Sequence, residues 1–163
     1  MNQDKITLER IELVHPKLRE DARDIYNDIC EALQGRAICR FSHTYRSFEE
    51  QDKLYNKKPR VTNAKGGQSY HNYGLAIDVV LLIDKDANGT FETASWDTKT
   101  DFDNDRTADW MEIVKIFRLY GWEWGGSWNT FPDYPHFQKT LGYSIKQLQR
   151  LHTSQGKPYF LSL

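Results

Sequence analysis

The stretch LAIDVVLL, residues Leu75–Leu82, indicates the fold more strongly than any other part of the chain. It is a short apolar run rich in β-branched residues, which is typical of a strand buried on both faces. Asp78 lies in the middle of this run. A carboxylate in a buried strand costs several kcal/mol unless it is paired, hydrogen-bonded or bound to a metal. We therefore expect Asp78 to have a partner.

The segments before this strand predict two helices and a further strand. Apolar residues at three- and four-residue spacing predict a helix from near Pro16 to Gly35. Residues Ala37–Phe41 read as a short strand. The capping box Ser47–Glu50 begins a second helix that runs to about Asn56.

The segments after this strand predict two more strands and two more helices. We expect a helix over Ala108–Tyr120, strands at Trp122–Trp124 and Tyr134–Gln138, and a last helix from Ser144 to about His152. Strands and helices mix without a regular strand-helix alternation. The predicted fold is α+β, with a small, mostly antiparallel sheet flanked by helices.

Length and composition indicate one domain over residues 1–163, large enough to bury a core without disulfides. We expect Cys30 and Cys39 to be core thiols, because one lies on an apolar helix face and the other in a strand. No apolar run approaches the roughly 20 residues of a membrane helix, and the start lacks a signal-peptide pattern. The sequence thus predicts synthesis in the cytoplasm and no stable membrane insertion.

The net charge of −1 argues against a protein that coats nucleic acid. The charges are segregated, however. The segment Lys53–Lys65 is basic and contains no acidic residue, whereas Asp84–Glu112 is strongly acidic. Either segment is compatible with an ordinary solvated surface.

Two histidines offer partners for Asp78. His71 lies in the loop that enters the strand, and His136 lies in an aromatic segment that could form a neighbouring strand. Two histidines and a carboxylate make a three-ligand zinc site with a fourth position open. The alternative is that Asp78 pairs with Arg46 and that the histidines are partly buried hydrogen-bonding groups.

Two motifs resemble those of a known family. Residues Ser69–Asp78 (SYHNYGLAID) fit the pattern SxHxxGxAxD, and Asp133–His136 (DYPH) fits acidic-x-x-His. Both are typical of the zinc D-alanyl-D-alanine carboxypeptidase superfamily. Residues Thr44–Gln51 and Trp122–Trp128 resemble the branch of L-alanyl-D-glutamate endopeptidases, which contains phage endolysins and related bacterial wall hydrolases. The resemblance spans about residues 10–140.

The resemblance implies a role for each matched residue. It assigns one zinc ion per chain to His71, Asp78 and His136, and the role of general base to Asp133. A carboxylate beside the zinc could take a proton from water and pass it to the leaving amine. Glu123 is a rival for that role, and Asp133 could instead be a turn carboxylate after Pro132.

Two more residues match the family pattern around the substrate. Arg46 matches an arginine that faces the scissile carbonyl, where it would stabilise the oxyanion. Ser69 matches a serine beside the substrate. Gln51 lies in a matched stretch, but its residue type suggests no role.

The resemblance implies a monomeric, hedgehog-like single-domain zinc endopeptidase that acts on the bacterial cell wall, without a separate wall-binding domain and without nucleic acid as a partner. Its substrate would be a peptidoglycan stem peptide, cut between L-alanine and D-glutamate. One alternative is a D-alanyl-D-alanine carboxypeptidase or dipeptidase of the same fold. Another is a non-catalytic zinc module that binds wall. Because stem peptides carry carboxylates, we expect Lys53–Lys65 to line or approach the substrate groove and Asp84–Glu112 to lie elsewhere.

The acidic segment also suggests calcium. Residues Asp84–Gly89 match the first half of an EF-hand loop, but position twelve is Ser95. A second candidate over Asp101–Glu112 has acidic residues at positions one, three, five and twelve, but Arg106 stands where that loop needs glycine. The alternatives are a hairpin turn for the first and an acidic helix start for the second.

Overall fold

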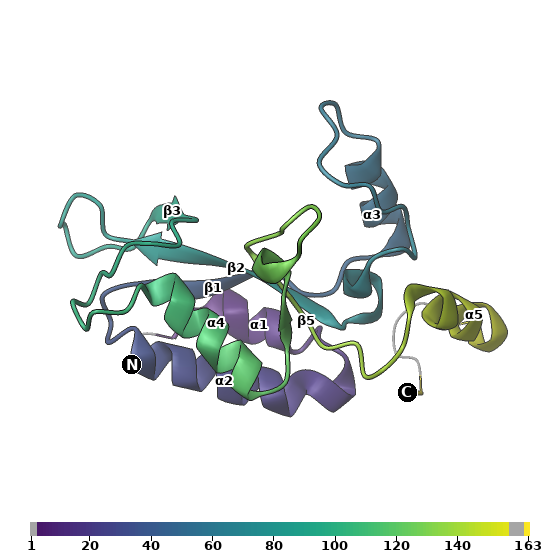
Figure 1. Cartoon of the computed structure of the whole chain (residues 1–163), viewed down its shortest axis with the longest axis horizontal. Helices are drawn as coiled ribbons and strands as arrows, with labels where there is room; N and C mark the ends of the chain where they lie inside the picture. The colour runs from purple at the N-terminus through teal and green to yellow at the C-terminus, as the bar shows by residue number, and fades with distance from the viewer. Residues whose placement is uncertain (1–2, 157–161) are drawn as a thin grey trace.

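The computed structural model of the protein describes residues 3–156 and 162–163. Within these residues the chain forms a five-stranded sheet whose paired strands are all antiparallel, together with five α-helices. The predicted α+β class is confirmed (Figure 1).

The strand predicted at Leu75–Leu82 lies at the centre of the sheet. The order is β1-β2-β5-β4. Strand β5 pairs with the first residues of β2, Ala76–Asp78, and β3 pairs with its last residues, Leu81–Ile83. The strands are β1 Ile38–His43, β2 Ala76–Ile83, β3 Thr93–Ser95, β4 Glu123–Trp124 and β5 His136–Gln138. All residues of β2 except Asp78 and Ile83 are buried, as expected of a strand covered on both faces.

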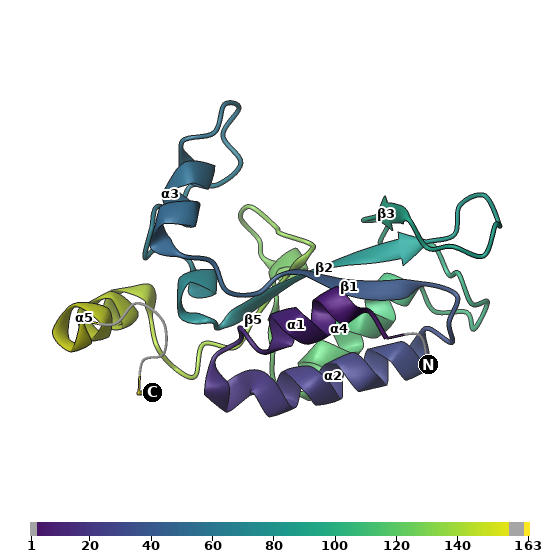
Figure 2. The same cartoon turned by 180° about the vertical axis from the view of Figure 1, so that it is seen from behind.

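Three helices cover one face of the sheet and two lie at its end. The helices are α1 Lys5–Ile11, α2 Arg19–Ala32, α3 Phe48–Tyr55, α4 Asp109–Leu119 and α5 Ile145–Gln155. In both Figure 1 and Figure 2, α1, α2 and α4 lie on the same side of the sheet, whereas α3 and α5 lie beyond the end where β2 begins. The apolar faces of α2 and α4 supply much of the core, through buried residues such as Ile25, Ile29, Trp110 and Phe117.

The observed boundaries differ from the predicted ones at two helices. The helix expected from Pro16 begins as a 3-10 turn, Pro16–Leu18, and becomes α-helical at Arg19. The last helix continues past His152 and ends where Gly156 adopts a left-handed conformation (φ 62°), a common helix-ending geometry. The capping box at Ser47 is confirmed.

The sequence did not predict α1 and β3. Helix α1 is short, and its N-cap Asp4 is held by a long-range contact to Arg40. Strand β3 is three residues long and exists through its pairing with β2. Both elements depend on tertiary contacts, which residue periodicity does not report.

The two cysteines lie in or against the core. Cys39 is buried, Cys30 is partly buried and both are free thiols, as expected of core residues. Among the described helices, none combines the length and apolar character needed to cross a membrane.

Candidate metal centre and active-site cleft

Strand register brings His136 opposite Asp78. In the antiparallel pairing of β2 and β5 these two residues are direct partners. His71 arrives from the short 3-10 helix Tyr70–Tyr73, which Ser69 caps and which leads into β2. His71 Nε2 and His136 Nδ1 each lie 3.0 Å from the same atom, Asp78 Oδ1. The three side chains form a group whose ligand atoms lie within 4.8 Å of one another and which could hold a metal ion.

The outer nitrogen of each histidine is held by an oxygen acceptor. His71 Nδ1 lies 2.7 Å from the carbonyl oxygen of Thr44, and His136 Nε2 lies 2.8 Å from Gln138 Oε1. Both acceptors require a hydrogen on the nitrogen that faces them. With hydrogens on these outer nitrogens, the inner nitrogens are the ones that can lose their hydrogens to a metal ion, as in metal-binding histidines that donate their other N–H to an oxygen.

The side chain of Asp78 is 19% exposed and is surrounded by basic groups. Burial raises its pKa, but the charges and hydrogen bonds of His71 and His136 outweigh burial and hold the pKa of Asp78 well below its usual range. Arg46 is also close, with its Nη2 3.9 Å from Asp78 Oδ2. The two kinds of partner that the sequence offered for Asp78, histidines and Arg46, are therefore both present.

Arg46 is held in place by Gln51. The Arg46 Nη1 donates to Gln51 Oε1 at 3.0 Å, and Gln51 Nε2 donates to the carbonyl oxygen of Ala64 at 2.8 Å. Gln51 is only 1% exposed, so this contact is shielded from water. The conformation of Arg46 is thus set by a buried amide whose role the sequence did not reveal.

Asp133 and Glu123, the two rivals for the base, lie in different surroundings. Asp133 lines the same cleft as His71, Asp78 and His136, and burial together with the charge of Asp78 raises its pKa. Both carboxylate oxygens of Glu123 are occupied, because Oε2 accepts from Gln138 Nε2 at 3.0 Å and Oε1 accepts from Trp128 Nε1 at 2.8 Å. Glu123 therefore orients Gln138, while Asp133 faces the cleft.

Gln138 is the supporting residue that sequence reasoning missed. It links Glu123 to the ring of His136 through its amide. Its position did contain a signal, because residues two apart on a strand share a face. Gln138 follows His136 at that spacing.

The cleft has a volume of about 560 Å³. Besides the residues already named, it is lined by Leu54, Val61, Thr62, Ala64, Gln68, Ser69, Tyr70 and Ile145, and by His43 and Trp128. The predicted approach of Lys53–Lys65 to the groove is thus made by its apolar and small residues, and the basic side chains are not among the lining residues. The acidic segment, which includes β3 and the first turn of α4, begins where β2 ends, at the end of that strand opposite the cleft (Figure 1).

The chain is similar to known proteins of one peptidase family. A family model described as D-alanyl-D-alanine carboxypeptidase matches residues 62–139, which include all three residues of the metal-binding group. The peptidoglycan L-alanyl-D-glutamate endopeptidase CwlK of Bacillus subtilis (strain 168) is 46% identical over 135 residues, covering 77% of this chain and 72% of the relative.

A solved structure shows the same fold. The L-Ala D-Glu endopeptidase ChiX of Serratia marcescens superposes with a TM-score of 0.56 at 24% identity, over 84% of this chain and 88% of that one. The fold, the matched motifs and the close sequence relationship to CwlK agree with one another. The chain belongs to the D-alanyl-D-alanine carboxypeptidase family of peptidases.

Proposed function

We propose that this protein is a zinc-dependent peptidoglycan hydrolase that cleaves stem peptides between L-alanine and D-glutamate. The observation that carries the proposal is the convergence of His71 Nε2 and His136 Nδ1 on Asp78 Oδ1, with the outer nitrogen of each ring bonded to an oxygen. The choice of bond is supported by the 46% identity to an enzyme named for that activity.

The donor set fits zinc. Imidazole nitrogen suits zinc and other transition metals, whereas magnesium and calcium prefer oxygen ligands. Two histidines and one carboxylate are the protein ligands of a catalytic zinc that keeps a further position for water or substrate. Zinc bound by His71, Asp78 and His136 would supply a Lewis acid and lower the pKa of water.

Asp133 is the proposed general base. It lies in the cleft with the three ligands and is free of the side-chain network that occupies Glu123. There it would accept a proton from the attacking water and deliver it to the leaving amine nitrogen. The same proton thus serves both halves of the hydrolysis.

Arg46 and Ser69 would contact the substrate. The guanidinium of Arg46, held by Gln51, borders the cleft next to Asp78 and would stabilise negative charge that develops on the scissile carbonyl oxygen. The Ser69 hydroxyl caps the helix that presents His71 and also lines the cleft. It would bond a backbone group of the peptide.

The test combines metal analysis with product analysis. Purified protein should contain one zinc per chain by elemental analysis, and digestion of purified sacculi should release fragments with new D-glutamate amino termini by mass spectrometry. Removal of terminal D-alanine alone would indicate the carboxypeptidase alternative. A folded, zinc-free protein with full activity, or a His136→Ala variant that behaves like wild type, would contradict the proposal.

One variant distinguishes an enzyme from a non-catalytic zinc module that only binds wall. If the protein only binds wall, Asp133→Ala should behave like wild type in every assay. If it is an enzyme, wild type should release amines from sacculi and Asp133→Ala should not.

A further inference from the structure

The acidic loop at the far end of β2 contains more ligand groups than its resemblance to an EF-hand loop first suggests. Counting from Asp101, acidic residues occupy positions one, three, five, nine and twelve of a twelve-residue loop, and Thr107 occupies position seven. The acidic residues are Asp101, Asp103, Asp105, Asp109 and Glu112. Position seven of an EF-hand loop contributes a backbone carbonyl, and position nine often contributes through water. The pattern therefore provides all six ligand positions.

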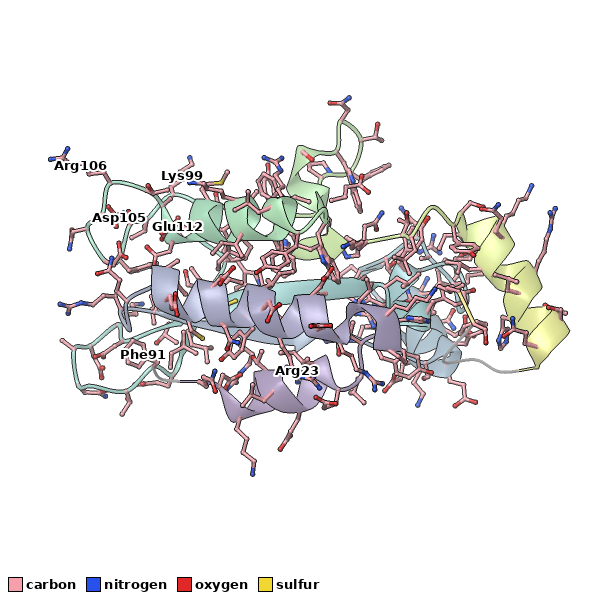
Figure 3. The ribbon with its side chains drawn as sticks, turned by 90° about the horizontal axis from the view of Figure 1, so that it is seen from below. Arg23, Phe91, Lys99, Asp105, Arg106 and Glu112 are labelled. Carbon is pink, nitrogen blue, oxygen red and sulfur yellow. The ribbon has the colours of Figure 1, made fainter. Side chains whose placement is uncertain are left out.

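The structure brings these carboxylates together. Ligand atoms of Asp101, Asp103 and Asp109 lie within 4.8 Å of one another, and so do those of Asp103, Asp105 and Glu112. The two groups share Asp103, so the five residues form one cluster. Figure 3 shows Asp105 and Glu112 close together at the start of α4, while Arg106 projects away from the body of the molecule.

An independent observation indicates that the cluster accommodates a ligand. Asp109 is completely buried, and its Oδ2 has no hydrogen-bond partner among the described residues, although Oδ1 accepts the N–H of Phe102 at 2.7 Å. Glu112 Oε2 is likewise inaccessible and without a partner in this part of the chain. A buried carboxylate oxygen without a partner is strongly unfavourable, and both of these oxygens belong to residues of the cluster.

No basic side chain of the described residues neutralises the negative charge of the cluster. Within the described residues none of the five carboxylates forms a salt bridge with a lysine or arginine; the contact from outside the loop is Gln34 Nε2, which donates to Asp103 Oδ2 at 2.9 Å. Burial and the neighbouring aspartates raise the pKa of Glu112 to about 7. A divalent cation would neutralise this repulsion.

We propose that Asp101, Asp103, Asp105, Asp109 and Glu112 form a calcium site that ties the loop to the first turn of α4. Carboxylate and carbonyl oxygens alone, in a flexible loop, are what calcium prefers, whereas zinc favours nitrogen and sulfur donors. The site lies at the opposite end of β2 from the zinc-binding group, so its effect is on stability and not on the chemistry. Helix α4 carries core residues Trp110 and Phe117, which makes its first turn a suitable point to anchor.

Residue 106 provides a distinctive prediction. The loop turns at Arg106 with φ 81°, a conformation that costs little for glycine and more for other residues. Replacing it with glycine removes this strain and one positive charge next to the ligands. Arg106→Gly should therefore bind calcium several-fold more tightly than wild type.

The experiment titrates calcium chloride into the zinc-loaded protein by calorimetry, with thermal unfolding as a second readout. Wild type should bind one calcium with a Kd of about 10⁻⁶ to 10⁻³ M, and the Tm should rise by several degrees. Glu112→Gln and Asp103→Asn should weaken binding roughly tenfold or more, since each removes a ligand charge. Asp86→Asn, in the neighbouring exposed acidic loop, is the matched control and should bind like wild type.

Three results would overturn the proposal. One is the absence of binding heat and of a Tm shift up to about 10 mM calcium. Another is an equal response to magnesium, which would indicate general screening of charge. The last is equal calcium affinity in wild type, Glu112→Gln and Asp103→Asn, each shown by circular dichroism to be folded.

Discussion

Gln138 Oε1 lies 2.8 Å from His136 Nε2, and this contact leaves Nδ1 as the nitrogen that faces Asp78. The amide of Gln138 is itself oriented by Glu123, which accepts its N–H, and Glu123 is held by Trp128. A chain of three side chains therefore sets the orientation of one imidazole ring. Removing partners of this kind usually lowers the affinity of a metal site by about tenfold to a hundredfold.

The first prediction concerns this chain. Gln138→Ala should weaken zinc binding about 10- to 100-fold, because the ring of His136 loses the acceptor that selects its tautomer. Competition with a chromophoric chelator measures the affinity. Gln155→Ala, exposed on α5, is the control and should match wild type. Equal zinc affinity in Gln138→Ala and wild type would show that Gln138 has no part in the site.

The second prediction separates the base from its rival. Asp133→Ala should keep zinc and lose about 10²- to 10⁴-fold in kcat, the usual contribution of a general base. Glu123→Ala should act through Gln138, so its zinc affinity should fall while kcat of the zinc-saturated variant is largely kept. Elemental analysis and initial rates at saturating zinc measure the two effects. The reverse pattern would transfer the role of base to Glu123.

The third prediction concerns the close approach at Gly125. A Cβ at this position would lie 2.5 Å from the carbonyl oxygen of Asp133 and 3.2 Å from the Cβ of His136. Gly125→Ala should therefore displace the proposed base and a proposed ligand together, and most activity should be lost. Activity and zinc content are measured on the folded variant.

Gly35→Ala is the control for Gly125→Ala. Gly35 has φ 72°, and apart from its neighbours in the chain no described residue has an atom within 4 Å of the position that a Cβ would take there, so alanine should cost about 1 kcal/mol of stability through backbone strain alone. Its activity below the Tm should equal that of wild type. If both variants lose activity in proportion to stability, the contact at Gly125 has no specific role.

The fourth prediction concerns folding stability. The side chain of Asp4 is 8% exposed, accepts from Arg40 Nε at 3.0 Å and Nη2 at 2.8 Å, and caps α1 through the N–H of Thr7. Asp4→Asn should lower the free energy of unfolding at pH 7 by about 1–3 kcal/mol, the usual value for a hydrogen bond to a charged group. Urea denaturation measures it. Glu9→Gln, which breaks the exposed pair with Lys5, should change stability by less than about 0.5 kcal/mol.

The pH dependence of this effect has a defined sign. Burial raises the pKa of Asp4, but Arg40 and Thr7 outweigh it, so the folded-state pKa lies below the ordinary value of 3.8. The stability from Asp4 is therefore present above that value and is lost as the pH falls through the folded-state pKa. The difference between wild type and Asp4→Asn should shrink in strongly acidic urea titrations. A difference that stays constant with pH would show that the charge of Asp4 is not responsible.

The fifth prediction concerns the basic segment. Lys57, Lys58 and Arg60 are exposed and do not line the cleft, so they would attract an acidic stem peptide at long range. Replacing all three by glutamine should lower kcat/KM at low ionic strength and flatten its salt dependence, because such attraction is screened by salt. Zinc content should not change. An identical salt profile in the variant would leave these residues as ordinary solvated surface.

The elements that could be predicted from the sequence are those whose cause is local. The apolar run of β2, the capping box at Ser47 and the helical spacing of α2 and α4 each depend on near neighbours in the chain. Elements such as α1 and β3 escaped because they depend on Arg40 and on pairing with β2. Motif resemblance also predicts the three residues of the metal-binding group, because these motifs are contiguous or closely spaced in the chain.

How those residues meet depends on the packing of the whole chain. The register of β2 and β5 places His136 opposite Asp78, and a shift of one residue would turn that side chain to the other face of the sheet. The roles of Gln138 and Gln51, and the buried oxygen of Asp109, likewise arise from contacts between strands, helices and loops that are folded against one another. Residue type states which bonds a side chain can form, but burial and register select which of them it forms, because both are properties of the packed chain.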